Sequence, residues 1–127
     1  MKPWRRPARF IMVGTAAAAV HWAVTVLAVE LTGVAPAWAN VCGWLVALVV
    51  SFIGHWRLTF GDRPVRPLRS ALRFAVLSAS AFAINAAAYA LLLRWGAVRY
   101  DVALAFVLAG VAMLSYLASR HWVFARD

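Results

Sequence analysis

Long apolar segments separated by short polar segments dominate the pattern of this chain. The first apolar run extends from Phe10 to about Leu31, and the residues TGVAP at 32–36 interrupt it. A helix of about 20 residues rises about 30 Å, the thickness of the hydrocarbon core of a bilayer. The run is therefore predicted to cross a membrane as a helix. Pro36 is expected in the first turn of the next helix, where proline is tolerated.

Three further apolar runs follow, over about Ala37–Phe52, Phe74–Leu93 and Val102–Leu117. Ile53, Gly54 and the aromatic Trp56 prolong the second run, but it is still short, so its ends are expected to reach into the membrane interface. The residues RWGAVRYD at 94–101 are predicted to form the turn between the last two runs. Apolar residues cover all faces of these helices, as is usual for membrane spans. Strands are not expected, because a membrane β-barrel needs about eight or more short alternating segments.

The N-terminus has the charge pattern of a signal peptide, with basic residues in positions 1–9 and a small-residue AAA sequence at 17–19. The apolar run that follows is longer than the roughly 7–15 residues of a signal peptide, and further apolar runs come after it. We therefore interpret it as an uncleaved first span.

Composition supports a membrane protein. The chain is 65% hydrophobic and only 13% charged, whereas soluble domains contain about 25% charged residues. The net charge of +9 would suggest a nucleic-acid partner for a soluble protein. Here the arginines form short clusters between apolar runs, which favours a membrane surface, and no nucleic-acid partner is expected.

Basic residues are divided unequally between the two ends of the predicted spans. Of 13 Lys and Arg residues, only Arg94 and Arg99 lie in the turn between the third and fourth spans. The others precede the first span, follow the fourth, or lie in the basic hinge at 57–73. Because cytoplasmic loops are rich in Lys and Arg, both termini and the hinge are predicted to face the cytoplasm. Four aromatic residues are expected to form an interfacial belt on that side: Trp56, Phe60, Trp122 and Phe124.

The two halves of the chain, 9–60 and 73–124, resemble each other. Arg9-Phe10 recurs 64 residues later as Arg73-Phe74, and the same shift carries Ser51-Phe52 onto Ser115-Tyr116. Two spans per half give both halves the same orientation, which predicts a parallel repeat about an axis along the membrane normal. The predicted fold is all-α and integral to the membrane. Its four transmembrane helices form two parallel-repeat hairpins in a single domain over 1–127.

Several short motifs resemble the GtrA-like family. They are RFIMVG at 9–14, Ala39-Asn40, SFIGHWRLTF at 51–60, RF at 73–74 and SYLASRHWVF at 115–124. The same domain is fused to some dolichol- or polyprenyl-phosphate mannose synthases. One departure is Trp56, where a basic residue is commoner.

The resemblance implies a multi-pass protein of the bacterial inner membrane that acts in cell-surface polysaccharide biosynthesis. Its expected function is to move, or flip, a polyprenyl-phosphate-linked sugar or its carrier lipid across the membrane. The alternative is a scaffold that recruits a glycosyltransferase and transports nothing. Because four spans make a thin wall around a sugar, a homo-oligomer is expected, most simply a homodimer.

Four arginines lie at the cytoplasmic ends of the predicted spans: Arg9, Arg57, Arg73 and Arg120. The planar guanidinium binds phosphate oxygens bidentately and stays charged, so these residues are candidates for binding the lipid phosphate. The alternative is a role in topology and in contact with anionic lipids, at about 1 kcal/mol per charge.

Three polar residues lie within the spans and are candidates for a polar path: His21, Asn40 and Asn85. Polar groups at that depth are costly and face the interior of a helix bundle. His21 and Asn85 are related by the 64-residue shift. The alternative is that they form hydrogen bonds between helices, which contribute about 0.6 kcal/mol on average.

No catalytic constellation, metal-ligand spacing or cofactor motif is visible, so the chain is predicted not to be an enzyme and to need no cofactor. A proton-coupled exporter would need a carboxylate deep in a span. Glu30 lies near a turn instead, and a Glu30–Arg94 ion pair at the outer interface is the simpler expectation.

Overall fold

A computed structural model of the chain describes residues 2–59, 67–96 and 98–122. Side chains are not described at 6, 59, 67–71, 74 and 115–122. The described secondary structure is entirely helical, which confirms the all-α prediction. The helices are α1 (Arg5–Thr32), α2 (Pro36–Gly54), the π-helix η1 (His55–Thr59), α3 (Pro67–Trp95) and α4 (Tyr100–Trp122).

Helix α1 has 28 residues and ends where the sequence predicts. Its interior is rich in alanine, which has the highest helix propensity, and no residue between Ala8 and Leu31 breaks it. Gly33 adopts a left-handed conformation, with φ of 68°, and its N–H donates to the carbonyl of Val29. Glycine accepts this conformation without a Cβ penalty. Pro36 then begins α2 as predicted.

The second span is longer than the sequence predicts. Helix α2 continues through Ile53 to Gly54, and η1 prolongs it to Thr59. The apolar helical segment therefore covers Pro36–Leu58, 23 residues. The expectation of a short span is wrong because the chain stays helical through Ile53, Gly54 and Trp56, and Leu58 extends the apolar segment past Arg57.

The described residues of the basic hinge, 57–59 and 67–73, are helical. Arg57 lies in η1, and α3 begins at Pro67, so Arg69 and Arg73 belong to α3. Proline suits the first turn of a helix, since its missing N–H has no intrahelical partner there. Residues 60–66 of the hinge lie outside the described part.

Within the described residues, three helical segments are long and apolar enough to cross a membrane: Pro7–Thr32, Pro36–Leu58 and Ala75–Trp95. The described apolar stretch of α4 is shorter, at Tyr100–Leu114. Large apolar side chains such as Leu31, Leu77 and Phe106 are well exposed on these helices. Such surfaces are unusual for a soluble monomer and are suited to lipid. The chain is a multi-pass membrane protein.

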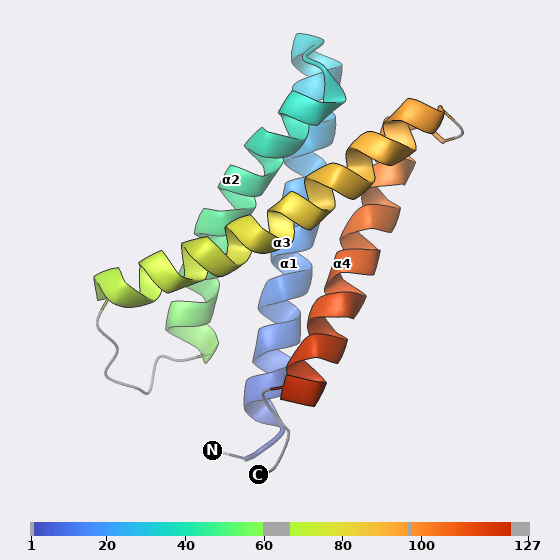
Figure 1. Cartoon of the computed structure of the whole chain (residues 1–127). Helices are drawn as coiled ribbons and strands as arrows, with labels where there is room; N and C mark the ends of the chain where they lie inside the picture. The colour runs from blue at the N-terminus through green and yellow to red at the C-terminus, as the bar shows by residue number, and fades with distance from the viewer. Residues whose placement is uncertain (1, 60–66, 97, 123–127) are drawn as a thin grey trace. The chain divides into compact units, whose positions relative to one another are not determined.

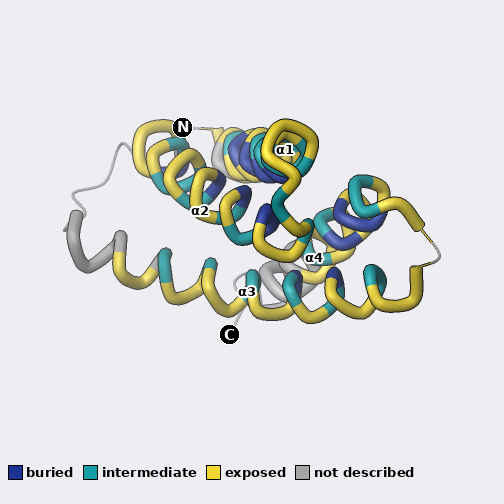
Figure 2. The backbone as a smooth tube through the Cα atoms, turned by 90° about the horizontal axis from the view of Figure 1, so that it is seen from above, coloured by how far each residue is buried: buried dark blue, intermediate teal, exposed yellow. Residues whose placement is uncertain are grey.

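Packing divides the chain into two units, Met1–Ser80 and Ala81–Asp127, with the boundary inside α3. In the first unit, α1 and α2 lie side by side as an antiparallel hairpin (Figure 1). Their buried residues gather where the two helices face each other (Figure 2). In the second unit, the rest of α3 packs with α4 around Tyr89, Ala103, Leu104 and Val107.

Candidate functional site

A buried polar pair joins α1 to α2. The Nε2 atom of His21 lies 2.7 Å from Oδ1 of Asn40, and both side chains are almost fully buried. Because a carbonyl oxygen only accepts, Nε2 carries the proton in this arrangement. The structure thus brings two of the three predicted path residues together. Their contact is a hydrogen bond between helices, which was the alternative interpretation to a polar path.

Thr25 and Gly43 set the close approach of the two helices beside this pair. The Thr25 hydroxyl donates to the carbonyl of His21 at 2.9 Å and lies 3.4 Å from the carbonyl of Ala39. A Cβ added to Gly43 would meet the Thr25 hydroxyl and would lie 2.6 Å from the His21 carbonyl oxygen. Any side chain at position 43 therefore forces α1 and α2 apart.

The glycines of the described helices differ in how closely other atoms approach them. At Gly54, as at Gly43, an added Cβ would be crowded, here by a methyl group of Val13 at 2.7 Å. No described atom lies within 4 Å of a Cβ built at Gly14 or Gly110. Sequence reasoning did not single out Thr25, although a second polar residue one turn after His21 was a usable signal.

The basic end of the first hairpin is held by Arg9. Its guanidinium donates from Nη1 to the carbonyl of Leu58 at 3.0 Å. The last carbonyls of a helix have no intrahelical partner and carry partial negative charge, so a cation there is favourable. One residue further, the ring of Phe10 stacks on His55 with 4.6 Å between centroids. Arg9 thus fastens the start of α1 to the end of the second span.

No described contact joins the other predicted phosphate-binding arginines to Arg9. Arg57 and Arg73 are exposed on η1 and α3, and the side chain of Arg120 lies outside the described part. Of the predicted aromatic belt, Trp56 is exposed and packs edge-on against Phe52 at 5.2 Å. The other three belt residues are not described: Phe60 and Phe124 lie outside the described residues, as does the side chain of Trp122.

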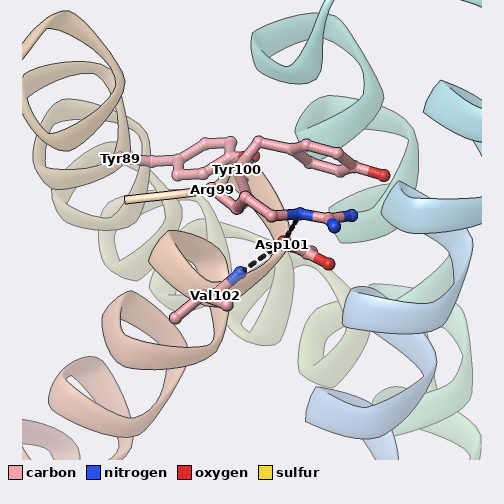
Figure 3. A network of polar contacts seen from close by, with 5 residues as sticks. All are labelled: Tyr89, Arg99, Tyr100, Asp101 and Val102. Atoms are coloured by element: carbon pink, nitrogen blue, oxygen red, sulfur yellow. Dashed lines mark hydrogen bonds and ion pairs between the residues drawn. The ribbon is translucent and has the colours of Figure 1, made fainter. Parts of the chain in front are cut away.

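The second unit has its own polar network near the turn between α3 and α4. The hydroxyl of Tyr89 donates to the carbonyl of Tyr100 at 3.1 Å. Asp101 accepts from the N–H of Val102 at 2.9 Å and pairs with Arg99 at 3.3 Å (Figure 3). An acidic residue is favourable in the first turn of a helix. Asn85, the third predicted path residue, is buried in this unit.

Buried positions in the two units correspond by the 64-residue shift found in the sequence. The corresponding buried pairs are His21 and Asn85, Thr25 and Tyr89, Ala39 and Ala103, Asn40 and Leu104, and Gly43 and Val107. The side chains differ in kind. The first unit uses small and polar groups at this level, whereas the second uses larger and mostly apolar ones. The internal repeat stays a prediction. A repeat of 64 residues would place buried residues at such corresponding positions.

A small open recess lies beside the His21–Asn40 pair, within the first unit. Its volume is about 150 Å³. Its apolar lining residues are Ala17, Ala18, Ala47 and Leu48. Its polar lining residues are His21, Trp44, Ser51 and Ser78. The indole N–H of Trp44 donates to the hydroxyl of Ser78 at 2.9 Å, which ties α2 to the first half of α3.

Sequence reasoning did not single out Trp44 or Ser78. Polar side chains within the apolar runs were the available signal, but nothing in the sequence indicates that these two meet. Among the described residues, no group of three or more His, Cys, Asp and Glu side chains is placed to hold a metal ion.

Comparison with known protein families identifies the family of the chain. The family model described as "GtrA/DPMS, transmembrane domain" matches residues 9–124. No curated protein and no solved structure matches the chain.

Proposed function

Because the chain belongs to the GtrA/DPMS transmembrane-domain family, a family of membrane domains associated with glycosylation pathways, we propose that it moves a polyprenyl-phosphate-linked sugar, or its carrier lipid, across the membrane. The observation that supports this most is the recess with polar lining residues at span depth, beside the buried pair of His21 and Asn40. A purely structural hairpin has no need of a polar hollow in an apolar span, where exposed polar groups are costly.

In this proposal Arg9 binds the lipid phosphate at the cytoplasmic end. Its guanidinium has five N–H donors, and its Nη1 is held by the Leu58 carbonyl. This contact fixes the guanidinium at the end of the hairpin, and preorganisation of that kind lowers the entropic cost of binding an anion. Arg57, Arg73 and Arg120 are proposed to add positive charge at the same membrane surface.

The polar residues at span depth have a different proposed role. The His21–Asn40 hydrogen bond gives each side chain a partner within the protein, so it lowers the cost of keeping them in the membrane. A passing headgroup can exchange hydrogen bonds with such a pair without leaving either group unpaired. Asn85 is proposed to act similarly in the second unit. The proposed setting is the bacterial inner membrane, with both termini in the cytoplasm and a homodimer as the working assembly.

The second candidate function is a scaffold that holds a glycosyltransferase at the membrane. The family description supports this candidate, because it groups GtrA with the transmembrane domain of DPMS proteins. In this alternative the basic surface binds lipid phosphate or a partner enzyme, and no lipid crosses.

Purified protein in liposomes distinguishes the two functions. The liposomes contain a polyprenyl-phosphate sugar, and a membrane-impermeant reagent reports how fast the sugar changes sides. We expect protein-dependent movement that falls at least tenfold in the Arg9→Ala/Arg73→Ala variant, because phosphate loses its bidentate donors. Arg5→Ala, which removes a charge of the same surface, is the matched control. Tight lipid binding without movement would favour the scaffold, and unchanged movement in the double variant would remove the phosphate site.

A further inference from the structure

The recess in the first unit is built like a small amphipathic binding site. Alanines of α1 and α2 contribute methyl groups to its lining, and Ser51, Ser78 and Trp44 contribute polar side chains. Ligand sites in proteins combine an apolar wall with a few convergent polar groups that fix orientation. Three helical segments contribute, since Ser78 lies in the first half of α3 and is anchored by Trp44.

The size of the recess limits what it can hold. Its volume is about 150 Å³, and a protein cavity of about 150 Å³ holds one six-membered ring such as benzene. A hydroxyl-bearing ring of this size has apolar C–H faces and polar edges. Its C–H faces would pack on the alanine methyl groups of the lining, and its hydroxyls would bond to the serine hydroxyls. Because the recess is open at one side, substituents of the ring can extend out of it.

The depth of the recess relates it to the basic end of the hairpin. Ser51 precedes Leu58, whose carbonyl holds Arg9, by a distance of roughly 10 Å along the helix at 1.5 Å per residue. The recess and Arg9 thus belong to one hairpin, with the recess deeper in the span. A headgroup with its phosphate near Arg9 can point its sugar inward, towards the recess.

We propose that this recess binds the sugar ring of the lipid-linked substrate during its passage, and that its occupant is a single hexose. The proposal rests on the proposed function and adds to it a sugar site, separate from the phosphate site. Small residues at Ala17, Ala18 and Ala47 are required because larger ones would fill the hollow. The serine hydroxyls orient the ring, and the anchored indole of Trp44 contributes to the lining.

The test fills the recess without changing its charge. Ala18 lines the recess, whereas Ala19 is exposed on the same helix, so Ala18→Leu and Ala19→Leu form a matched pair. Binding and movement are measured in liposomes for two probes, polyprenyl-phosphate-glucose and polyprenyl phosphate without sugar. For Ala18→Leu we expect at least a tenfold loss for the glucose lipid and less than a twofold change for the sugar-free lipid. Ala19→Leu should match the wild type for both.

The outcomes separate this proposal from the proposed function. Equal losses for both lipids, or no loss for either, overturn the sugar site even if the wild type transports. A wild type that binds the glucose lipid but moves nothing overturns translocation, while a selective loss of glucose-lipid binding in Ala18→Leu still supports the sugar site. A wild type that binds no glucose lipid overturns both. If Ala18→Leu fails to insert, Ser51→Ala replaces it, and undiminished affinity for the glucose lipid then overturns the proposal.

Discussion

At the residue scale, the pairing of His21 with Asn40 decides how a polar group survives within an apolar span. An ionisable or amide side chain at that depth is costly unless it has a partner. Here each side chain satisfies the other at 2.7 Å, and Thr25 adds a hydroxyl bonded to the backbone nearby. The pair is therefore a structural element first, and any role in passage builds on it.

A double-mutant cycle on this pair should show a real but modest coupling. His21→Leu and Asn40→Leu, singly and together, are expected to give a coupling energy of about 0.6–1.7 kcal/mol, between the average and the largest values for interhelical hydrogen bonds in membranes. The free energy of unfolding in SDS is the measurement. Cys42→Leu, an exposed site on α2, is the control and should leave stability within about 0.5 kcal/mol of wild type. Zero coupling would contradict the bond.

At the scale of the elements, the two helical hairpins bury corresponding positions but fill them with side chains of different size. Gly43 lets α1 and α2 meet so closely that backbone atoms take part in the contact. At the corresponding level of the second unit, Tyr89 and Val107 fill the space between α3 and α4 with side chains. Small residues at helix interfaces are the usual means of close packing in membranes. The proposed sugar site accordingly lies in the unit with the smaller side chains.

Gly43→Ala should destabilise the first hairpin. The added methyl meets the His21 backbone carbonyl at 2.6 Å, and a backbone atom cannot move aside as a flexible side chain can. Overpacking of this kind costs about 1–3 kcal/mol, measured as the free energy of unfolding in SDS.

Gly14→Ala is the matched control because it lies in the same hairpin and meets no described atom within 4 Å. It should be neutral or stabilising by up to about 1 kcal/mol, the difference in helix propensity between glycine and alanine. Equal effects of the two substitutions would show that the helices do not meet at Gly43.

At the scale of the whole molecule, charge sets the orientation proposed for the chain. Lys2 and Arg5 lie at the start, whereas Arg94 and Arg99 lie in the turn between α3 and α4. The excess of basic residues outside that turn favours cytoplasmic termini, because positively charged segments are retained on the cytoplasmic side.

Cysteine labelling tests this orientation. In a Cys42→Ser background, Lys2→Cys should react with a membrane-impermeant maleimide only after the inner membrane is permeabilised. Val98→Cys, in the exposed turn, should react in intact spheroplasts. The reverse pattern at both positions would invert the topology and place Arg9 on the outer side. That result would also remove the cytoplasmic phosphate site from the proposal.

The helices of this protein were predictable from sequence because their signals are local. Runs of about 20 apolar residues, the breaks at Gly33 and Pro36, and the first-turn preference of proline each act over a few residues. The end of the second span was not predictable in the same way. Apolar and aromatic residues continue past Arg57 there, and the chain stays helical as a π-helix that packs against the start of α1.

The sequence alone therefore determined the membrane class, the four helices, their turns and the identity of the polar residues within the spans. Tertiary structure alone decided which of those residues meet. It paired His21 with Asn40, tied Trp44 to Ser78 and placed Arg9 on the Leu58 carbonyl. It also left the recess that His21, Trp44 and Ser78 help to line. The reason is physical: helix formation depends on neighbours along the chain, whereas these contacts depend on the separation and rotation of packed helices. Small residues such as Gly43 set both.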